Sequence, residues 1–185
     1  MRTLLTVLSA IVLLAYPFAV YFGLDKLGLN VVALLLGAVF LLRIFSGHQA
    51  KLKELKHLAV LSGMVGVTLV TLGAIFKQQG WLTFYPVVIN LSMLAVFALS
   101  LTQSQTVIER LARLQQPDLP ESGVRYTRTV TKVWCAFFVC NAAIALYTCF
   151  QPLHVWTLYN GLISYLAAGS LFAGEWIVRQ RVRKD

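Results

Sequence analysis

Three asparagines lie inside long apolar runs of this 185-residue chain. Asn90, Asn141 and Asn160 are flanked mainly by aliphatic and aromatic residues. An unpaired amide in an apolar layer is costly, so we expect each side chain to bond to a neighbouring helix. Alternatively, the three amides converge on a cavity and contact a substrate that crosses the layer.

Glu175 is the acidic residue that lies closest to an apolar run, and Arg179 follows it by one helical turn. This spacing predicts an ion pair at the polar border of the run. A proton relay or a substrate-binding carboxylate is the alternative, because an acidic group inside a membrane layer is usually functional.

Side chains that could catalyse a reaction do not form a recognised motif. The sequence has no G-x-S-x-G, no H-E-x-x-H and no Gly-rich phosphate loop. His57 lies three residues after Glu54, which is a helical spacing for a histidine and an acid. Cys135, Cys140 and Cys149 share one apolar run without a C-x-x-C pair, as small packing residues do. We predict no catalytic residue, no metal site and no cofactor.

The polar segment 102–132 carries a dense group of charged side chains. A helix is expected over about 104–115, and its apolar residues share one face: Val107, Ile108, Leu111 and Leu114. Glu109 and Arg113 have the spacing of an i,i+4 ion pair, and Pro117 and Pro120 end the helix. This pattern predicts an amphipathic segment on the membrane surface, with its basic side toward lipid phosphates.

Further basic residues, Arg125, Arg128 and Lys132, lead with Tyr126 into the next apolar run. Their charge could serve only to set the topology of the chain. A second interpretation is a site for an anionic head group, a phosphopantetheine arm or an acidic partner protein.

The composition indicates the elements that must position these side chains. Hydrophobic residues make up 58% of the chain and charged residues 12%, whereas a soluble domain has about 25% charged residues. Backbone groups in a bilayer must be satisfied internally, so the apolar runs are predicted to be helices. The chain is therefore expected to be one all-α transmembrane bundle over 1–185, with six spans: about 4–22, 27–45, 58–76, 81–101, 133–150 and 155–177.

The 16 Lys and Arg residues are divided unequally between the two sides of this bundle. Only Lys26 and Lys77 fall in the short loops of one side, and all others lie in the N-terminus, 46–57, 102–132 or the C-terminal tail, apart from Arg43 near the end of the second run. The positive-inside rule places the basic side, with both termini, in the cytoplasm. The net charge of +9 is thus expected to face membrane lipids, not nucleic acid. Trp81 and Trp156 are predicted to form an aromatic belt at the opposite side.

Five short motifs stand out in the second part of the chain: WLTFYP at 81–86, IERLAR at 108–113, DLP at 118–120, YTR at 126–128, and YNG at 159–161. Together they resemble a family of uncharacterised bacterial inner-membrane proteins encoded in aryl polyene or xanthomonadin-like pigment clusters. The chain is more distantly similar to intracellular septation protein A. The resemblance covers about residues 58–180 and implies an envelope location. It marks these positions without assigning a role: Glu109, Arg110, Arg113, Tyr126, Arg128, Trp134, Asn141, Trp156, Tyr159 and Asn160.

These observations lead to a first hypothesis of a non-enzymatic inner-membrane protein. It would scaffold or assist envelope lipid or aryl-polyene-type biosynthesis through the 102–132 loop, with membrane lipids and acyl-chain or envelope biosynthesis proteins as partners. The rival hypotheses are a small transporter or flippase for a lipid-linked product, a septation-protein-A-like division factor, and a membrane enzyme that acts on acyl chains.

Overall fold

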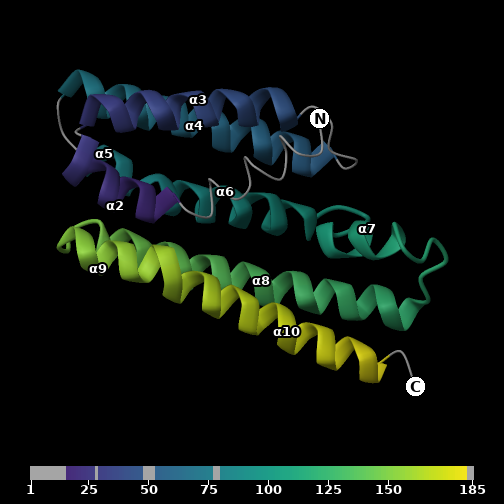
Figure 1. Cartoon of the computed structure of the whole chain (residues 1–185). Helices are drawn as coiled ribbons and strands as arrows, with labels where there is room; N and C mark the ends of the chain where they lie inside the picture. Colours follow the sequence, from purple (N-terminus) through teal and green to yellow (C-terminus); the bar gives the residue numbers. More distant parts are fainter. Residues whose placement is uncertain (1–15, 28, 48–52, 77–79, 183–185) are drawn as a thin grey trace.

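The computed structural model describes residues 16–27, 29–47, 53–76 and 80–182, and the regular elements in these ranges are helices (Figure 1). The all-α prediction is confirmed for this part of the chain. In chain order the elements are α2 (Tyr16–Leu27), α3 (Leu29–Gly47), α4 (Lys53–Phe76), α5 (Gly80–Thr83), α6 (Tyr85–Ser100), α7 (Val107–Arg113), α8 (Glu121–Thr148), α9 (Leu153–Leu158), the π-helical turn η1 (Tyr159–Ile163) and α10 (Ser164–Val182).

Three helical stretches in the described ranges are long and apolar enough to cross a bilayer: Gly80–Ser100, Glu121–Thr148 and Leu153–Gln180. A shorter apolar helix covers Ser62–Leu72. The described residues thus contain fewer candidate spans than the six predicted. The predicted run 4–22 lies mostly outside the described residues, and so do many side chains of the two runs after it.

Helix boundaries differ from the predicted ones where polar residues continue a helix. α8 begins at Glu121, not near residue 133, because Pro120 is extended and Glu121 supplies a favourable acidic first turn. Apolar runs alone do not reveal these first turns, in which Thr127 and Val130 are nevertheless buried. α2 continues to Leu27, so Lys26, which was predicted to lie in a short loop, is instead in the last turn of that helix.

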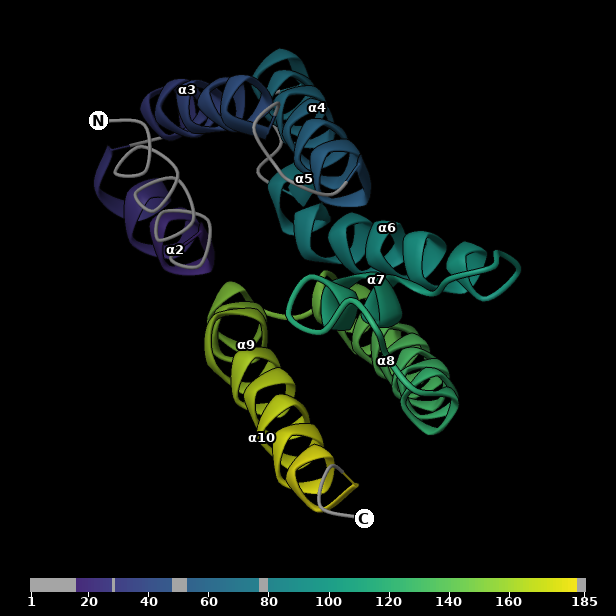
Figure 2. The ribbon, with the colours of Figure 1, turned by 90° about the vertical axis from the view of Figure 1, so that its right-hand side faces the viewer.

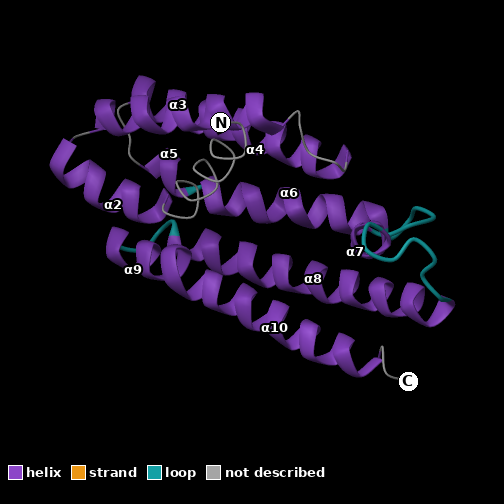
Figure 3. Cartoon of the chain, turned by 45° about the vertical axis from the view of Figure 1, so that its right-hand side comes forward, coloured by secondary structure: helices purple, strands orange, loops and turns teal. Residues whose placement is uncertain are grey.

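The helices run side by side with their ends gathered in two groups. α3 packs on α4, and α6 packs along α8 (Figure 2). α7, the first turns of α8 and the C-terminus of α10 lie at one end, and α5 and α9 lie at the other (Figure 1). The teal connections in Figure 3 that flank α7 belong to the first group. This end, comprising residues 101–132 and 175–182, is called the α7 end below.

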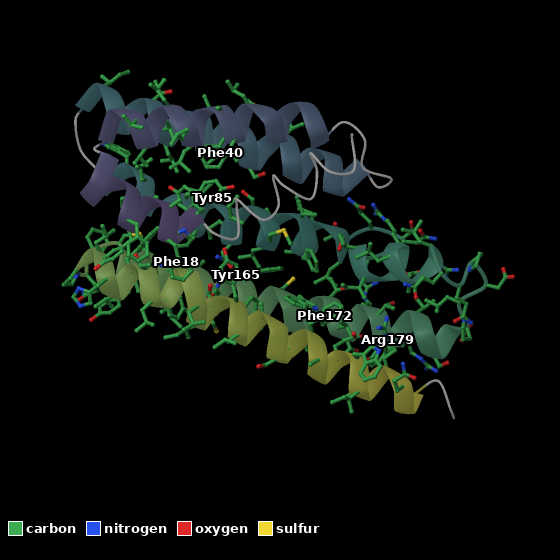
Figure 4. The ribbon with its side chains drawn as sticks, in the orientation of Figure 1. Phe18, Phe40, Tyr85, Tyr165, Phe172 and Arg179 are labelled. Atoms are coloured by element: carbon green, nitrogen blue, oxygen red, sulfur yellow. The ribbon has the colours of Figure 1, made fainter. Side chains whose placement is uncertain are left out.

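One apolar cluster holds the end opposite α7. The ring of Tyr16 lies 4.7 Å from that of Tyr85, and Phe40 lies 4.8 Å from Tyr85, measured between centroids. Figure 4 shows Phe40 and Tyr85 close together between the α3–α4 pair and α6. Gly66 on α4 makes this approach possible, because a Cβ there would lie 2.4 Å from the Phe40 ring. Trp156 from α9 completes the cluster and is fully buried.

A second apolar cluster lies nearer the α7 end, between α6, α7 and α8. Its buried members are Phe97, Val107 and Phe138, and Trp134 packs against them. Rings of Phe97 and Phe138 meet edge to face at 5.2 Å. The α6–α8 pair therefore has a packed interior along its length and positions the polar residues described next.

Large apolar side chains cover much of the outer surface. Leu34 is 76% exposed, Phe150 74% and Phe172 60%, and Phe172 is labelled on α10 in Figure 4. Exposed apolar area on this scale is unusual for a soluble monomer. It agrees with helices whose outer faces contact lipid.

Candidate functional site

A helix break at Pro86 is held together by side chains from distant segments. Pro86 has no N–H, so the carbonyl of Leu82 has no helical partner four residues later. The Tyr16 hydroxyl donates to the Leu82 carbonyl at 2.6 Å, and Trp156 Nε1 donates to the Thr83 carbonyl at 2.9 Å. Both donors are buried. Residues of α2 and α9 therefore satisfy carbonyls at the break between α5 and α6.

This position of Trp156 corrects the predicted aromatic belt. A belt residue lies at the lipid–water interface, whereas the Trp156 side chain has 0% exposure. The sequence pattern places Trp156 correctly at a helix start, but does not reveal on which face it lies. Trp81 is partly buried and packs against the same cluster.

Asn141 links α8 to both of its neighbours in the apolar layer. Its Nδ2 donates to Asn90 Oδ1 on α6 at 2.9 Å, and its Oδ1 accepts from the Tyr159 hydroxyl at 2.7 Å. Asn90 Nδ2 in turn donates to the carbonyl of Pro86 at 2.8 Å. The expected bonding of these asparagines to other helices is present.

The motif residues after Tyr159 attach the π-helical turn η1 to α8 and α2. Asn160 Nδ2 donates to Thr148 Oγ1 at 3.0 Å and to the carbonyl of Trp156 at 2.9 Å. A Cβ on Gly161 would lie 2.9 Å from the ring of Phe18, so only glycine leaves room for that ring. π-helical turns of this kind occur often at functional sites. Here the turn is fixed by side-chain bonds on one face and by α2 on the other.

The short helix α7 folds back against the end of α6 and α8. Thr106 caps it by accepting a bond from the Glu109 amide at 3.3 Å, and Ser100 Oγ accepts one from the Val107 amide at 3.1 Å. Val107 is buried, and Ile108 packs against the same cluster. α7 therefore covers the second apolar cluster with part of its apolar face.

The remaining apolar residues of α7 are exposed. Leu111 is 36% exposed and Leu114 56%. The predicted amphipathic segment over about 104–115 is thus a shorter helix whose apolar face is divided. Val107 and Ile108 pack into the protein interior. Hydrophobic periodicity shows that a helix has an apolar face, but it does not show whether that face contacts protein or lipid.

Glu109 and Arg113 form the predicted ion pair. Arg113 Nη2 lies 2.9 Å from Glu109 Oε1, and Glu109 is only 3% exposed. Arg113 Nη1 also donates to the carbonyl of Pro117 at 2.9 Å. One guanidinium therefore ties the buried carboxylate to the turn that follows α7.

Two further arginines bond to the connection between α6 and α7. Arg110 bonds to the Gln103 side chain and, at 3.0 Å, to the carbonyl of Gln105. Arg128 on α8 donates to the carbonyl of Leu101 at 2.6 Å. That carbonyl lies just beyond the C-terminus of α6, where carbonyls lack helical partners and a cation is favoured.

Tyr126 connects α8 to α10 at the same end. Its hydroxyl lies 3.1 Å from the carbonyl oxygen of Glu175 and 3.3 Å from Glu175 Oε1. Arg179 Nε lies 3.7 Å from the same carboxylate oxygen, as the i,i+4 spacing predicted. Glu175 is therefore part of a contact between two helices.

The predicted positions of interest separate into two groups. At the α7 end lie Glu109, Arg110, Arg113, Tyr126, Arg128 and Glu175, with Trp134 in the apolar cluster beneath them. In the apolar interior lie Asn141, Trp156, Tyr159 and Asn160.

Residues that the sequence did not mark also take part in these networks. The T-x-x-E pattern of Thr106 and Glu109 is a capping-box signature that would have predicted the start of α7. Tyr16 and Thr148 carry no such signal, because their partners lie far away in sequence.

No group of three His, Cys, Asp or Glu side chains within the described ranges could hold a metal ion. Cys149 is not merely a packing residue, since its Sγ donates to the carbonyl of Thr83 at 3.2 Å. The side chains of His57 and Glu54 lie outside the described residues.

Comparisons with protein-family models, with curated proteins and with solved structures give no match. The resemblance to the aryl polyene family and to septation protein A therefore stays a prediction. The site must be judged from its own geometry. Its cations and acids bond largely to one another and to backbone carbonyls. Its surface also carries two exposed leucines, Leu111 and Leu114, and more basic than acidic side chains.

Proposed function

We propose that this chain is a non-enzymatic integral protein of the bacterial inner membrane, with six transmembrane helices and both termini in the cytoplasm. The three apolar helices and the exposed apolar side chains support a membrane location. The arrangement of the helix ends supports the orientation, because the basic segment 102–132 and the end of α10 lie together (Figure 1).

Within this topology, the chain acts as a scaffold or accessory factor for envelope lipid or aryl-polyene-type biosynthesis. The observation that carries this role is the ordered structure of the α7 segment. The bonds of Arg113 to Pro117 and of Arg128 to Leu101 fix the segment, while Leu111 and Leu114 stay exposed. Charge that only sets topology needs no fixed shape, whereas a docking surface does.

The experiment tests whether the exposed leucines carry partner binding. The full chain is produced in its native host and crosslinked to the acyl carrier protein of the same biosynthetic system. Leu111→Asp with Leu114→Asp should abolish the crosslink and lower product formation, because each change places a charge on the docking face. Gln116→Asp, on an exposed neighbour, is the matched control and should retain both. Unchanged crosslinking and product in the double variant would exclude the scaffold role.

The proposed topology has a separate test. Reporter fusions after Lys26, Lys77 and His154 should read as periplasmic, because these positions belong to the weakly charged side. A cytoplasmic signal at any of the three would rule out the six-helix arrangement.

Transport of a lipid-linked product is the second candidate function. It is favoured by the group of Asn90, Asn141 and Tyr159, which lies in the apolar layer beside the turn η1. Asn141→Leu should then stop movement of labelled product across proteoliposomes while leaving the partner crosslink intact. The scaffold role is preferred because these polar groups are engaged in helix–helix bonds.

A septation-like role is a third proposal, and it predicts a division defect on deletion of the gene. Filamentous cells with normal product levels would favour it over both other functions.

A further inference from the structure

The basic side chains between residues 110 and 132 differ in how they are used. Arg110, Arg113 and Arg128 bond to the α6–α7–α8 connection. Arg125 and Lys132 are exposed, and the side chain of neither makes a hydrogen bond or an ion pair within the part of the chain that the structure describes. The structure therefore separates three cations that hold the protein together from two that face outward.

Arg125 and Lys132 lie on one face of α8. They are seven residues apart, which is two helical turns and about 10 Å along the axis. The exposed face continues directly into apolar residues, beginning with Val133 at 44% exposure and followed by exposed Ala136 and Cys140. The two cations thus stand where the polar end of α8 meets its apolar surface.

The acidic groups nearby leave this pair uncompensated. Glu121 lies one turn before Arg125, yet no ion pair within 4.0 Å joins them among the described residues. Glu175 is directed to Tyr126 and Arg179 instead. A free guanidinium and a free ammonium at this spacing suit a phosphate group, which arginine binds through two parallel bonds and lysine as a point charge.

We propose that Arg125 and Lys132 bind the phosphate of an anionic phospholipid, whose acyl chains lie along the exposed apolar face of α8 beyond Val133. The proposal rests on the membrane orientation given under the proposed function. A lipid is favoured over a protein partner because charge and apolar surface are continuous on the same helix face. The bound lipid anchors α8, and with it the α7 segment, at the inner leaflet.

The test measures lipid binding to the full chain, purified in detergent and freed of lipid, by native mass spectrometry. Phosphatidylglycerol should bind more tightly than phosphatidylcholine. Because one cation near an anionic surface changes affinity about 5-fold, Arg125→Gln or Lys132→Gln should weaken phosphatidylglycerol binding by that factor. The double variant should weaken it about 30-fold, and phosphatidylcholine binding should be unaffected.

Matched variants distinguish this site from general charge. Arg179→Gln removes the same charge from a guanidinium on α10 that is already engaged by Glu175, and should leave lipid binding unchanged. Arg125→Lys with Lys132→Arg should bind as the wild type does, which keeps the test valid if the neutral variants fold poorly. Far-ultraviolet circular dichroism monitors the helix content of each.

Several results would overturn the proposal. One is phosphatidylglycerol binding by the double Gln variant that equals that of the wild type, and another is an equal loss of binding in Arg179→Gln. Glycerol phosphate that binds as tightly as the lipid would indicate a soluble phosphate ligand. Displacement of the lipid by polyglutamate at low concentration would indicate an acidic protein partner. The acyl carrier protein crosslink is scored separately, so failure here leaves the scaffold role to its own test.

Discussion

Replacement of Tyr16 by Phe isolates the hydrogen bond that serves the break at Pro86. The Phe ring keeps the contacts with Phe40 and Tyr85 and removes only the hydroxyl that donates to Leu82 at 2.6 Å. The Leu82 carbonyl would then be buried without a donor, because Leu82 has 0% exposure and residue 86 has no N–H.

The expected loss follows from two sets of magnitudes. A buried polar group left unsatisfied costs about 1–3 kcal/mol in soluble proteins. Interhelical hydrogen bonds in membrane proteins contribute about 0.6 kcal/mol on average and at most about 1.7. We therefore expect Tyr16→Phe to lower the free energy of unfolding by about 1 kcal/mol. In a Pro86→Ala background the amide of residue 86 can donate to the Leu82 carbonyl. Tyr16→Phe should then lower the free energy of unfolding by close to zero.

The assay is reversible unfolding of the full chain in mixed micelles with increasing sodium dodecyl sulfate, followed by circular dichroism. The coupling energy of the Tyr16 and Pro86 double-mutant cycle is the decisive quantity. Tyr147→Phe is the control, because Tyr147 is 64% exposed. It should leave the free energy of unfolding almost unchanged in either background. An equal loss from Tyr16→Phe in the wild-type and the Pro86→Ala backgrounds would refute the explanation of the break.

Two other predictions use the same unfolding assay. Asn141→Leu should destabilise by about 1–3 kcal/mol, because it leaves Asn90 Oδ1 without its donor and the Tyr159 hydroxyl without its acceptor; a loss below about 0.5 kcal/mol would show that the network is not structural. Gly161→Leu should cost about 1–3 kcal/mol by overpacking against α2. The matched Gly169→Leu, where nothing lies within 4 Å of the added Cβ, should change stability little, and equal losses would disprove the role of the close contact.

Local patterns explain which features of this chain were predictable. The i,i+4 spacing of Glu109 and Arg113 was sufficient to predict their ion pair, because helical geometry alone brings the two groups together. Glu175 and Arg179 follow the same logic. The cost of an unpaired amide likewise predicted that Asn141 would bond to another helix.

Features that depend on partners distant in sequence were predicted incompletely. The pairing of Asn141 with both Asn90 and Tyr159 requires three helical segments to meet, and sequence reasoning predicted only the need for a partner. Trp156 was wrongly placed in an aromatic belt, because its burial depends on α2 and the break at Thr83. The early start of α8 was missed because its first turns are polar on several sides and are buried only by packing.

The sequence by itself determined that this protein is helical and apolar, because these properties follow from residue type and periodicity. Tertiary structure alone decided how the polar residues are used. It bonds Arg113 and Arg128 to backbone carbonyls that flank α7, and it leaves the Arg125 and Lys132 side chains without such partners. All four are basic residues in one segment, and only the positions of nearby carbonyl and carboxylate oxygens distinguish them.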